Sequence, residues 1–103
     1  MNIGLTKEDL DEIIYIFKKF PNVESVVLYG SRAMGNFKKG SDVDLALKGA
    51  IDFSSLSSIN AHLNEGIPLP YFFDILIYNN IKNESLKEHI DRYGKVIYEK
   101  EKN

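Results

Sequence analysis

Gly30 to Gly35 read Gly-Ser-Arg-Ala-Met-Gly, and Ser41 to Leu47 read Ser-Asp-Val-Asp-Leu-Ala-Leu. The first segment places a glycine and a hydroxyl side chain directly after an apolar stretch, and the second contains two aspartates two positions apart. This order is typical of a turn that binds phosphate, followed by a site that binds a metal ion. We therefore interpret the rest of the chain as support for these two segments.

The flanking residues predict two antiparallel strands. Val23 to Tyr29 is short, contains three valines and is followed by Gly30, which predicts a largely buried strand. Apolar and polar residues alternate over residues 43–48, so a second strand there has an apolar back and a polar front. Because residues 30–41 are too few to hold a crossover helix, we expect them to form a structured loop with one helical turn after the serine.

Periodicity predicts the remaining helices and strands. Apolar residues at helical spacing, with capping residues and breakers at the ends, predict three helices, and two apolar segments predict further strands. The helices are expected over residues of about 6–20, 52–65 and 83–93, and the strands over residues 72–78 and 96–98. The second and third strands are far enough apart for a helical crossover. We therefore expect an α/β (α+β) fold: a small mixed sheet with helices packed on one face.

Size and composition limit the class of protein. The chain of 103 residues is long enough for one domain, expected over residues 1–103 with a solvated tail at 99–103. A net charge of −2 argues against an extended nucleic-acid partner. The sequence has no cysteine, no signal-peptide pattern and no apolar run that could span a membrane. We therefore expect a cytoplasmic protein without disulfides or membrane contact.

Asp42 and Asp44 are the first candidates for chemistry. Aspartate is disfavoured in strands, and a spacing of two along a strand directs both carboxylates from the same face. Two close carboxylates repel each other unless a cation lies between them, and their hard oxygens suit Mg²⁺ or Mn²⁺. The alternative is that Asp42 only caps the turn and that Asp44 faces solvent.

Asp74 is the third candidate, because it is the one charged residue in an otherwise apolar predicted strand. An unpaired buried carboxylate is costly, and a metal ion shared with Asp42 and Asp44 would remove that cost. The alternative is an aspartate on an edge strand that faces water.

The glycine-serine turn completes the candidate site. Gly30 allows the backbone to approach a ligand closely, and Ser31 offers a hydroxyl and a backbone N–H to a phosphate. Arg32 is expected either to neutralise phosphate charge, as part of a nucleotide-binding turn, or to hold the loop. The alternative is an ordinary glycine turn with a polar surface.

Together these residues resemble a known family. Gly-Ser-x-Ala-x-Gly at residues 30–35, followed by Ser-Asp-x-Asp-Leu at residues 41–45, resembles the signature of the DNA polymerase beta-like nucleotidyltransferase superfamily. Nearly the whole chain, to the closing segment at residues 94–98, is similar to the minimal nucleotidyltransferases, the MNT domain proteins of HEPN/MNT toxin–antitoxin pairs. Met34 departs from the pattern, since many relatives carry a second arginine there.

The resemblance implies a site and a reaction. Asp42, Asp44 and Asp74 match the catalytic carboxylates that bind two Mg²⁺ ions, with Mn²⁺ as the other suitable metal. Gly30 and Ser31 match the turn that binds the triphosphate. The implied reaction is the transfer of AMP from ATP to a tyrosine hydroxyl of a HEPN toxin, whose ribonuclease activity is thereby silenced.

Two other functions stay open on the sequence alone. The same chemistry serves small-molecule hydroxyls in aminoglycoside nucleotidyltransferases, although those relatives are longer. A non-catalytic antitoxin would only bind its toxin, although such a binder has no need of three acids on one face. The sequence also leaves open which nucleotide is preferred, how many AMP units are added, and whether homo- or hetero-oligomers form.

Overall fold

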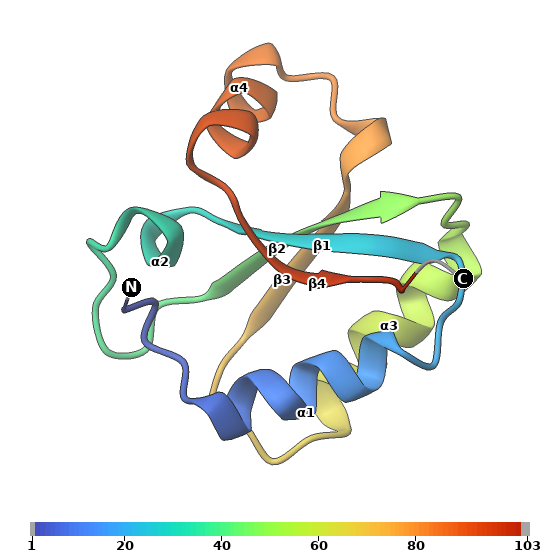
Figure 1. The fold of residues 1–103 in the computed structure, drawn as a ribbon, viewed down its shortest axis with the longest axis horizontal. Helices are drawn as coiled ribbons and strands as arrows, with labels where there is room; N and C mark the ends of the chain where they lie inside the picture. The colour runs from blue at the N-terminus through green and yellow to red at the C-terminus, as the bar shows by residue number, and fades with distance from the viewer. Residues whose placement is uncertain (1, 102–103) are drawn as a thin grey trace.

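The computed structural model describes residues 2–101, which form a four-stranded mixed sheet with helices on both faces (Figure 1). This confirms the mixed sheet predicted from the sequence. The strands are β1 (Val23–Tyr29), β2 (Val43–Gly49), β3 (Phe73–Ile77) and β4 (Lys95–Glu99). The helices are α1 (Lys7–Phe17), α2 (Ser31–Met34), α3 (Phe53–Glu65) and α4 (Glu84–Tyr93), and a 3₁₀ turn, η1 (Tyr78–Asn80), follows β3.

The strand order in the sheet is β3-β2-β1-β4. β1 runs antiparallel to β2 and β4, whereas β2 and β3 are parallel. The short connection that contains α2 joins the antiparallel pair, and α3 makes the crossover between the parallel pair, as the spacing of the strands predicts. β3 and β4 are therefore the two edges of the sheet.

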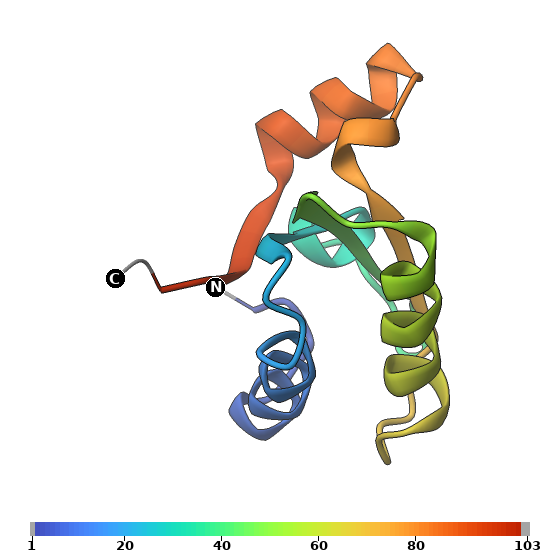
Figure 2. The same cartoon turned by 90° about the vertical axis from the view of Figure 1, so that its right-hand side faces the viewer.

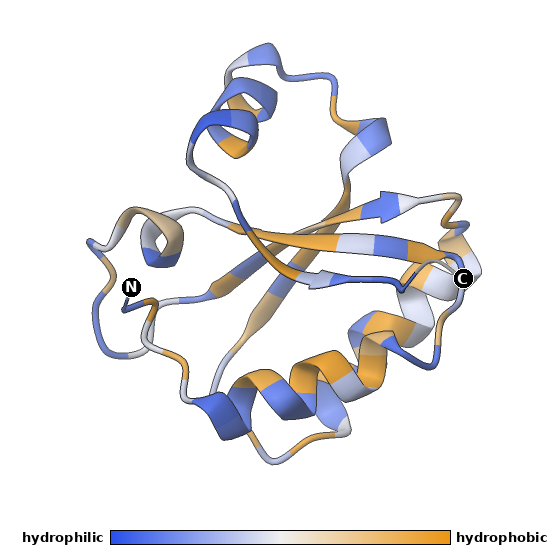
Figure 3. Ribbon diagram, in the orientation of Figure 1, coloured by the Kyte–Doolittle hydropathy of each residue, from blue (hydrophilic) through white to orange (hydrophobic). Residues whose placement is uncertain are grey.

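The two faces of the sheet are covered differently (Figures 1 and 2). α1 and α3 pack on one face over the main core, which includes Leu45 and Phe73. α4 lies on the other face, where Ile90 packs in a smaller cluster with Val27 and Ala46. The prediction of helices on one face therefore holds for α1 and α3 but not for α4. The reason is that the central strands, largely apolar in Figure 3, supply buried residues to both faces: Leu28 and Leu45 to the main core, Val27 and Ala46 to the smaller cluster.

Local capping residues set where the helices begin. Thr6 and Asp9 form a capping box at α1: the Asp9 N–H donates to Thr6 Oγ1 (3.0 Å), and the Thr6 N–H donates to Asp9 Oδ2 (3.1 Å). Asp52 and Asn83 accept backbone N–H groups at α3 and α4. α1 ends at Phe17 rather than near residue 20. None of the helices within residues 2–101 has the length and apolar character needed to cross a membrane.

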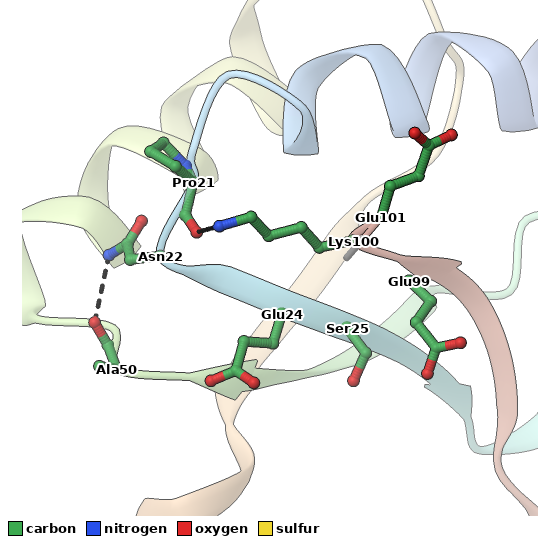
Figure 4. Close-up of a pocket in the computed structure, with 8 residues that line it drawn as sticks. All are labelled: Pro21, Asn22, Glu24, Ser25, Ala50, Glu99, Lys100 and Glu101. Carbon is green, nitrogen blue, oxygen red and sulfur yellow. Dashed lines mark hydrogen bonds between the residues drawn. The ribbon is translucent and has the colours of Figure 1, made fainter. Parts of the chain in front are cut away.

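The last described residues continue the sheet edge instead of leaving it. Glu99 is the final residue of β4. The Lys100 backbone N–H donates to the Glu24 carbonyl (2.8 Å), and Lys100 Nζ donates to the Pro21 carbonyl (2.8 Å; Figure 4). The side chains of Glu99, Lys100 and Glu101 are exposed, and residues 102–103 of the predicted solvated tail lie outside the described residues.

Candidate active site

Strand pairing brings the predicted carboxylates to one face of the sheet. Asp44 is the direct partner of Asp74 in the parallel register of β2 and β3, and it is the partner of Tyr29 in the antiparallel register of β1 and β2. Directly paired residues point to the same face of a sheet. This face is the one covered by α4, because Tyr29 packs in the same cluster as Ile90. Asp42 lies just before the start of β2, close enough for its charge to act on the Asp44 carboxyl.

Exposure distinguishes the three aspartates. Asp44 is half-buried, whereas Asp42 and Asp74 are exposed. Asp74 lies in the edge strand β3 and faces water, so the inference that its burial requires a metal ion is wrong. Asp74 remains a candidate metal ligand because it is paired with Asp44 across the two strands.

The three carboxylates lie near one another but do not form an assembled metal site. Within the described part of the chain, no group of three or more His, Cys, Asp or Glu side chains is placed to hold a metal ion. Like charges on directly paired strand residues repel, which opposes the convergence of these side chains. The donor set nevertheless fits a hard divalent cation, because it consists of carboxylate oxygens on adjacent strands.

The surroundings of Asp44 shift the pKa of its carboxyl. Partial burial, and then the negative charges of Asp74 and Asp42, raise the pKa of the Asp44 carboxyl above its usual range. Burial, and then the charges of Asp44 and Asp74, also raise the pKa of the Tyr29 phenol. Burial is the larger cause of both pKa shifts, and the neighbouring carboxylates, whose charge a bound divalent cation would neutralise, add to it.

Gly30 has a backbone conformation that residues with side chains avoid. Its φ is 77° and its ψ is −153°. A Cβ atom at this position would collide with Oδ2 of Asp44. α2 starts directly afterwards at Ser31, which confirms the predicted helical turn. The glycine-serine turn and the aspartate pair are therefore in contact in the folded protein, as well as close in sequence.

Arg32 holds the loop between the two halves of the motif. Its side chain is buried, with 3% of its surface exposed. Nε and Nη2 donate to the Ser41 carbonyl (3.3 and 2.8 Å), and Nη1 donates to the Ile3 carbonyl (3.1 Å). The rings of Phe37 and Tyr71 have centroids 5.2 and 5.0 Å from the guanidinium carbon. The sequence predicted that Arg32 either neutralises phosphate charge or holds the loop, and the structure shows that it holds the loop. A direct phosphate contact of Arg32 stays a prediction, which these engaged donors disfavour.

The substitution Arg32→Lys should lower the free energy of unfolding by about 2–4 kcal/mol, because an ammonium group cannot replace the planar fork of donors between two rings. Urea denaturation measures this change. Arg92→Lys is the matched control, since Arg92 is exposed and lies 3.9 Å from Glu88, and it should change stability by no more than about 0.5 kcal/mol. Equal effects of the two substitutions would contradict the structural role of Arg32.

His89 is a neighbour of the site that the sequence did not reveal. His62 and His89 lie on separate predicted helices without a pattern of partner residues, so the sequence predicts a surface or helix-packing role for each. For His62 packing is confirmed, because its ring lies edge-on to Phe20 with centroids 5.8 Å apart. His89 instead accepts a hydrogen bond at Nε2 from the Gly30 N–H (3.1 Å). No local signal predicts this contact, because it joins residues 59 positions apart.

A hollow of about 610 Å³ lies at the opposite end of the sheet from the aspartates (Figure 4). It is bordered by the start of β1, the residue after β2 and the end of β4. Its lining includes the three acidic residues Glu24, Glu99 and Glu101 but none of the residues predicted for the site. The open face around Asp44 therefore remains the candidate site, since the chemically suited groups gather there.

Comparison with known proteins follows this geometry. The family described as "Polymerase beta, Nucleotidyltransferase" matches residues 11–103. No curated protein matches the chain.

Solved structures share the fold at low sequence identity. A toxin–antitoxin structure with AMP-PNP is 20% identical with a TM-score of 0.73, covering 89% of this chain and 74% of that one. A complex of tri-AMPylated Shewanella oneidensis HEPN toxin with MNT antitoxin is 18% identical with a TM-score of 0.65, covering 88% and 70%. The toxin–antitoxin structure MntA-HepT is 17% identical with a TM-score of 0.67, covering 92% and 74%.

Proposed function

Because the chain belongs to the polymerase beta nucleotidyltransferase family, we propose that it transfers AMP from ATP to a hydroxyl group of a HEPN toxin and so acts as the antitoxin. The observation that carries this proposal is the pairing of Asp44 with Asp74 directly beside the turn at Gly30. This arrangement puts the acidic side chains and the proposed phosphate-binding turn next to each other, as transfer of a nucleotide requires.

The structural neighbours support the choice of donor and acceptor. One neighbour is a toxin–antitoxin structure with AMP-PNP, an analogue of ATP. Another contains a HEPN toxin that carries three AMP groups, in complex with an MNT antitoxin. We propose a tyrosine hydroxyl as the acceptor, in keeping with the resemblance of this chain to minimal nucleotidyltransferases. ATP as donor implies that the reaction takes place in the cytoplasm.

The three aspartates are the residues that would hold the metal. Asp42 and Asp44 would hold two Mg²⁺ ions through their carboxylate oxygens, and Asp74 would help to hold one of them, with Mn²⁺ as the alternative metal. Bound there, such ions lower the pKa of the acceptor hydroxyl and neutralise phosphate charge. The charges of Asp74 and Asp42, which add to burial in raising the pKa of Asp44, support this assignment because a divalent cation would neutralise them.

The protein groups themselves position the reactants. Gly30 and Ser31 bind the outer phosphates of ATP, so that the α-phosphorus faces the aspartates. Asp74 accepts the proton of the attacking hydroxyl, and its exposure on the edge strand leaves room for a large acceptor. Attack in line with the departing pyrophosphate depends on this positioning more than on covalent chemistry by the protein.

The substitution Asp74→Asn tests the reaction directly. With labelled ATP, MgCl₂ and the protein encoded by the adjacent gene, the wild-type protein should label that neighbour, which the proposal expects to be a HEPN protein. Asp74→Asn should reduce the rate of AMP transfer at least about tenfold, because the attacking hydroxyl then has no carboxylate to take its proton. Asp11→Asn, an exposed change on α1 paired only with Lys7, should transfer at the wild-type rate.

The same assay separates the alternative functions. Label found only on a small hydroxylated compound would favour an aminoglycoside-type enzyme. Neutralisation of the toxin without any labelling, by a double variant Asp42→Asn/Asp44→Asn, would favour an antitoxin that acts by binding alone.

A further inference from the structure

His89 joins the last helix to the phosphate-binding turn. It lies on α4 and is half-buried on the face of the sheet that carries the aspartates. Its ring contacts Tyr29 at a centroid distance of 6.2 Å and Tyr93 at 5.5 Å. These two rings limit the movement of the imidazole, and Nε2 is directed at the Gly30 N–H (3.1 Å).

This hydrogen bond defines the state of the imidazole. Because a backbone N–H only donates, Nε2 of His89 must be the unprotonated acceptor, and the proton of the neutral ring lies on Nδ1. The donor is the backbone group at the point where β1 ends and α2 begins, beyond the last ladder pair of Tyr29 with Asp44. His89 therefore supplies the acceptor that the strand ladder does not.

Gly30 is held from three sides. Its N–H donates to His89, its carbonyl accepts from the Met34 N–H (3.2 Å), and its α-carbon lies against Asp44. Glycine without such contacts would move freely between conformations, since it lacks the side chain that restricts φ and ψ. The orientation of the following peptide, which presents the Ser31 N–H, depends on this restraint.

We propose that His89 is a positioning residue, which holds the turn at Gly30 and Ser31 in the geometry that binds the triphosphate. This inference rests on the proposed function for the identity of the ligand, ATP. His89 acts through the Gly30 peptide and does not contact the reacting atoms. Its loss should therefore weaken nucleotide binding more than it slows the chemical step.

Three substitutions separate the hydrogen bond from the packing of the ring. His89→Phe keeps a ring between Tyr29 and Tyr93 but has no acceptor. His89→Gln places an amide oxygen close to the position of Nε2, whereas His89→Asn places it near Nδ1, too far from Gly30. Thermal unfolding of each variant reports any general loss of stability.

The expected result is a split between KM and kcat. His89→Phe and His89→Asn should raise the KM for ATP about tenfold, the effect of losing one well-placed hydrogen bond, while kcat changes less than about threefold. His89→Gln should restore KM to within about threefold of wild type. Equal KM values in all four proteins would overturn the proposal. So would a fall in kcat common to the Phe and Gln variants with unchanged KM, because that result assigns His89 to the chemistry.

A second readout does not depend on activity. Hydrogen exchange of the Gly30 amide, followed by NMR in the protein without nucleotide, should be faster in His89→Phe than in wild type and slow again in His89→Gln. Unchanged exchange in His89→Phe would overturn the proposal even if the enzyme is active. If wild-type protein transfers no AMP, the proposed function fails, and the exchange experiment still decides whether His89 holds the turn.

Discussion

Replacing Asp44 with asparagine should abolish AMP transfer while making the metal-free protein more stable. Asp44 is the one aspartate paired with Asp74, next to Gly30 and in the middle of the proposed metal set. Removing its charge should lower the rate at least about a hundredfold, the order expected when a main electrostatic group of an active site is lost. The rate of label transfer from ATP to the HEPN protein measures the effect, with Asp11→Asn as the control.

The gain in stability has an electrostatic cause. Asp44 and Asp74 are like charges at directly paired strand positions, and relieving such a pair is worth about 0.2–1 kcal/mol. Because folding raises the pKa of Asp44, the folded protein binds the proton more tightly than the unfolded chain does. The free energy of unfolding of the wild-type protein therefore falls as the pH rises from about 4 through the folded pKa of this carboxyl. The asparagine variant has no carboxyl at this position, so this fall is absent from it.

Thermal unfolding over a pH series tests that prediction. Asp44→Asn should have the higher Tm at pH 7, and the difference should vanish below about pH 4, where the carboxyl is protonated in both states. Adding MgCl₂ with ATP should then raise the Tm of the wild type and leave the variant almost unchanged, since ligands stabilise only the state that binds them. A variant less stable than wild type at pH 7 would show that the Asp44 charge stabilises the fold.

Gly30→Ala should likewise inactivate the enzyme, through backbone geometry. The new Cβ would collide with the Asp44 carboxylate, which must then leave its place beside Asp74. A displacement of this kind in a reacting group typically costs about a hundredfold in rate. The positive φ adds a destabilisation of about 1–2 kcal/mol, because a side chain is strained in that conformation.

Gly40→Ala is the matched control for this substitution. Gly40 also has a positive φ, of 87°, but nothing lies within 4 Å of where its Cβ would be. Both variants should therefore lose stability in urea denaturation, Gly30→Ala by the larger amount because of the collision, and only Gly30→Ala should lose AMP transfer. Comparable activity of the two variants would show that contact between the turn and Asp44 is unimportant for the reaction.

The sequence alone determined the local parts of this structure. The run of apolar residues before Gly30, the alternation around Asp44, and the capping residues Thr6 and Asp52 all predicted elements that the structure contains. These signals can be interpreted without the rest of the chain, because the strand alternation and the capping hydrogen bonds that they describe involve residues close in sequence. The same is true of the helical turn after the glycine.

Tertiary structure alone decided what meets at the site and how much of it is exposed. Asp74 lies beside Asp44 because β3 pairs in parallel with β2, and it faces water because β3 is an edge strand. Arg32 holds the loop, and His89 reaches Gly30, through contacts between distant segments. Strand order and the side of the sheet that α4 covers depend on the packing of apolar surfaces far apart in sequence. A local pattern can therefore nominate the acids and the turn, but their arrangement and supporting contacts are set by the packing of the whole chain.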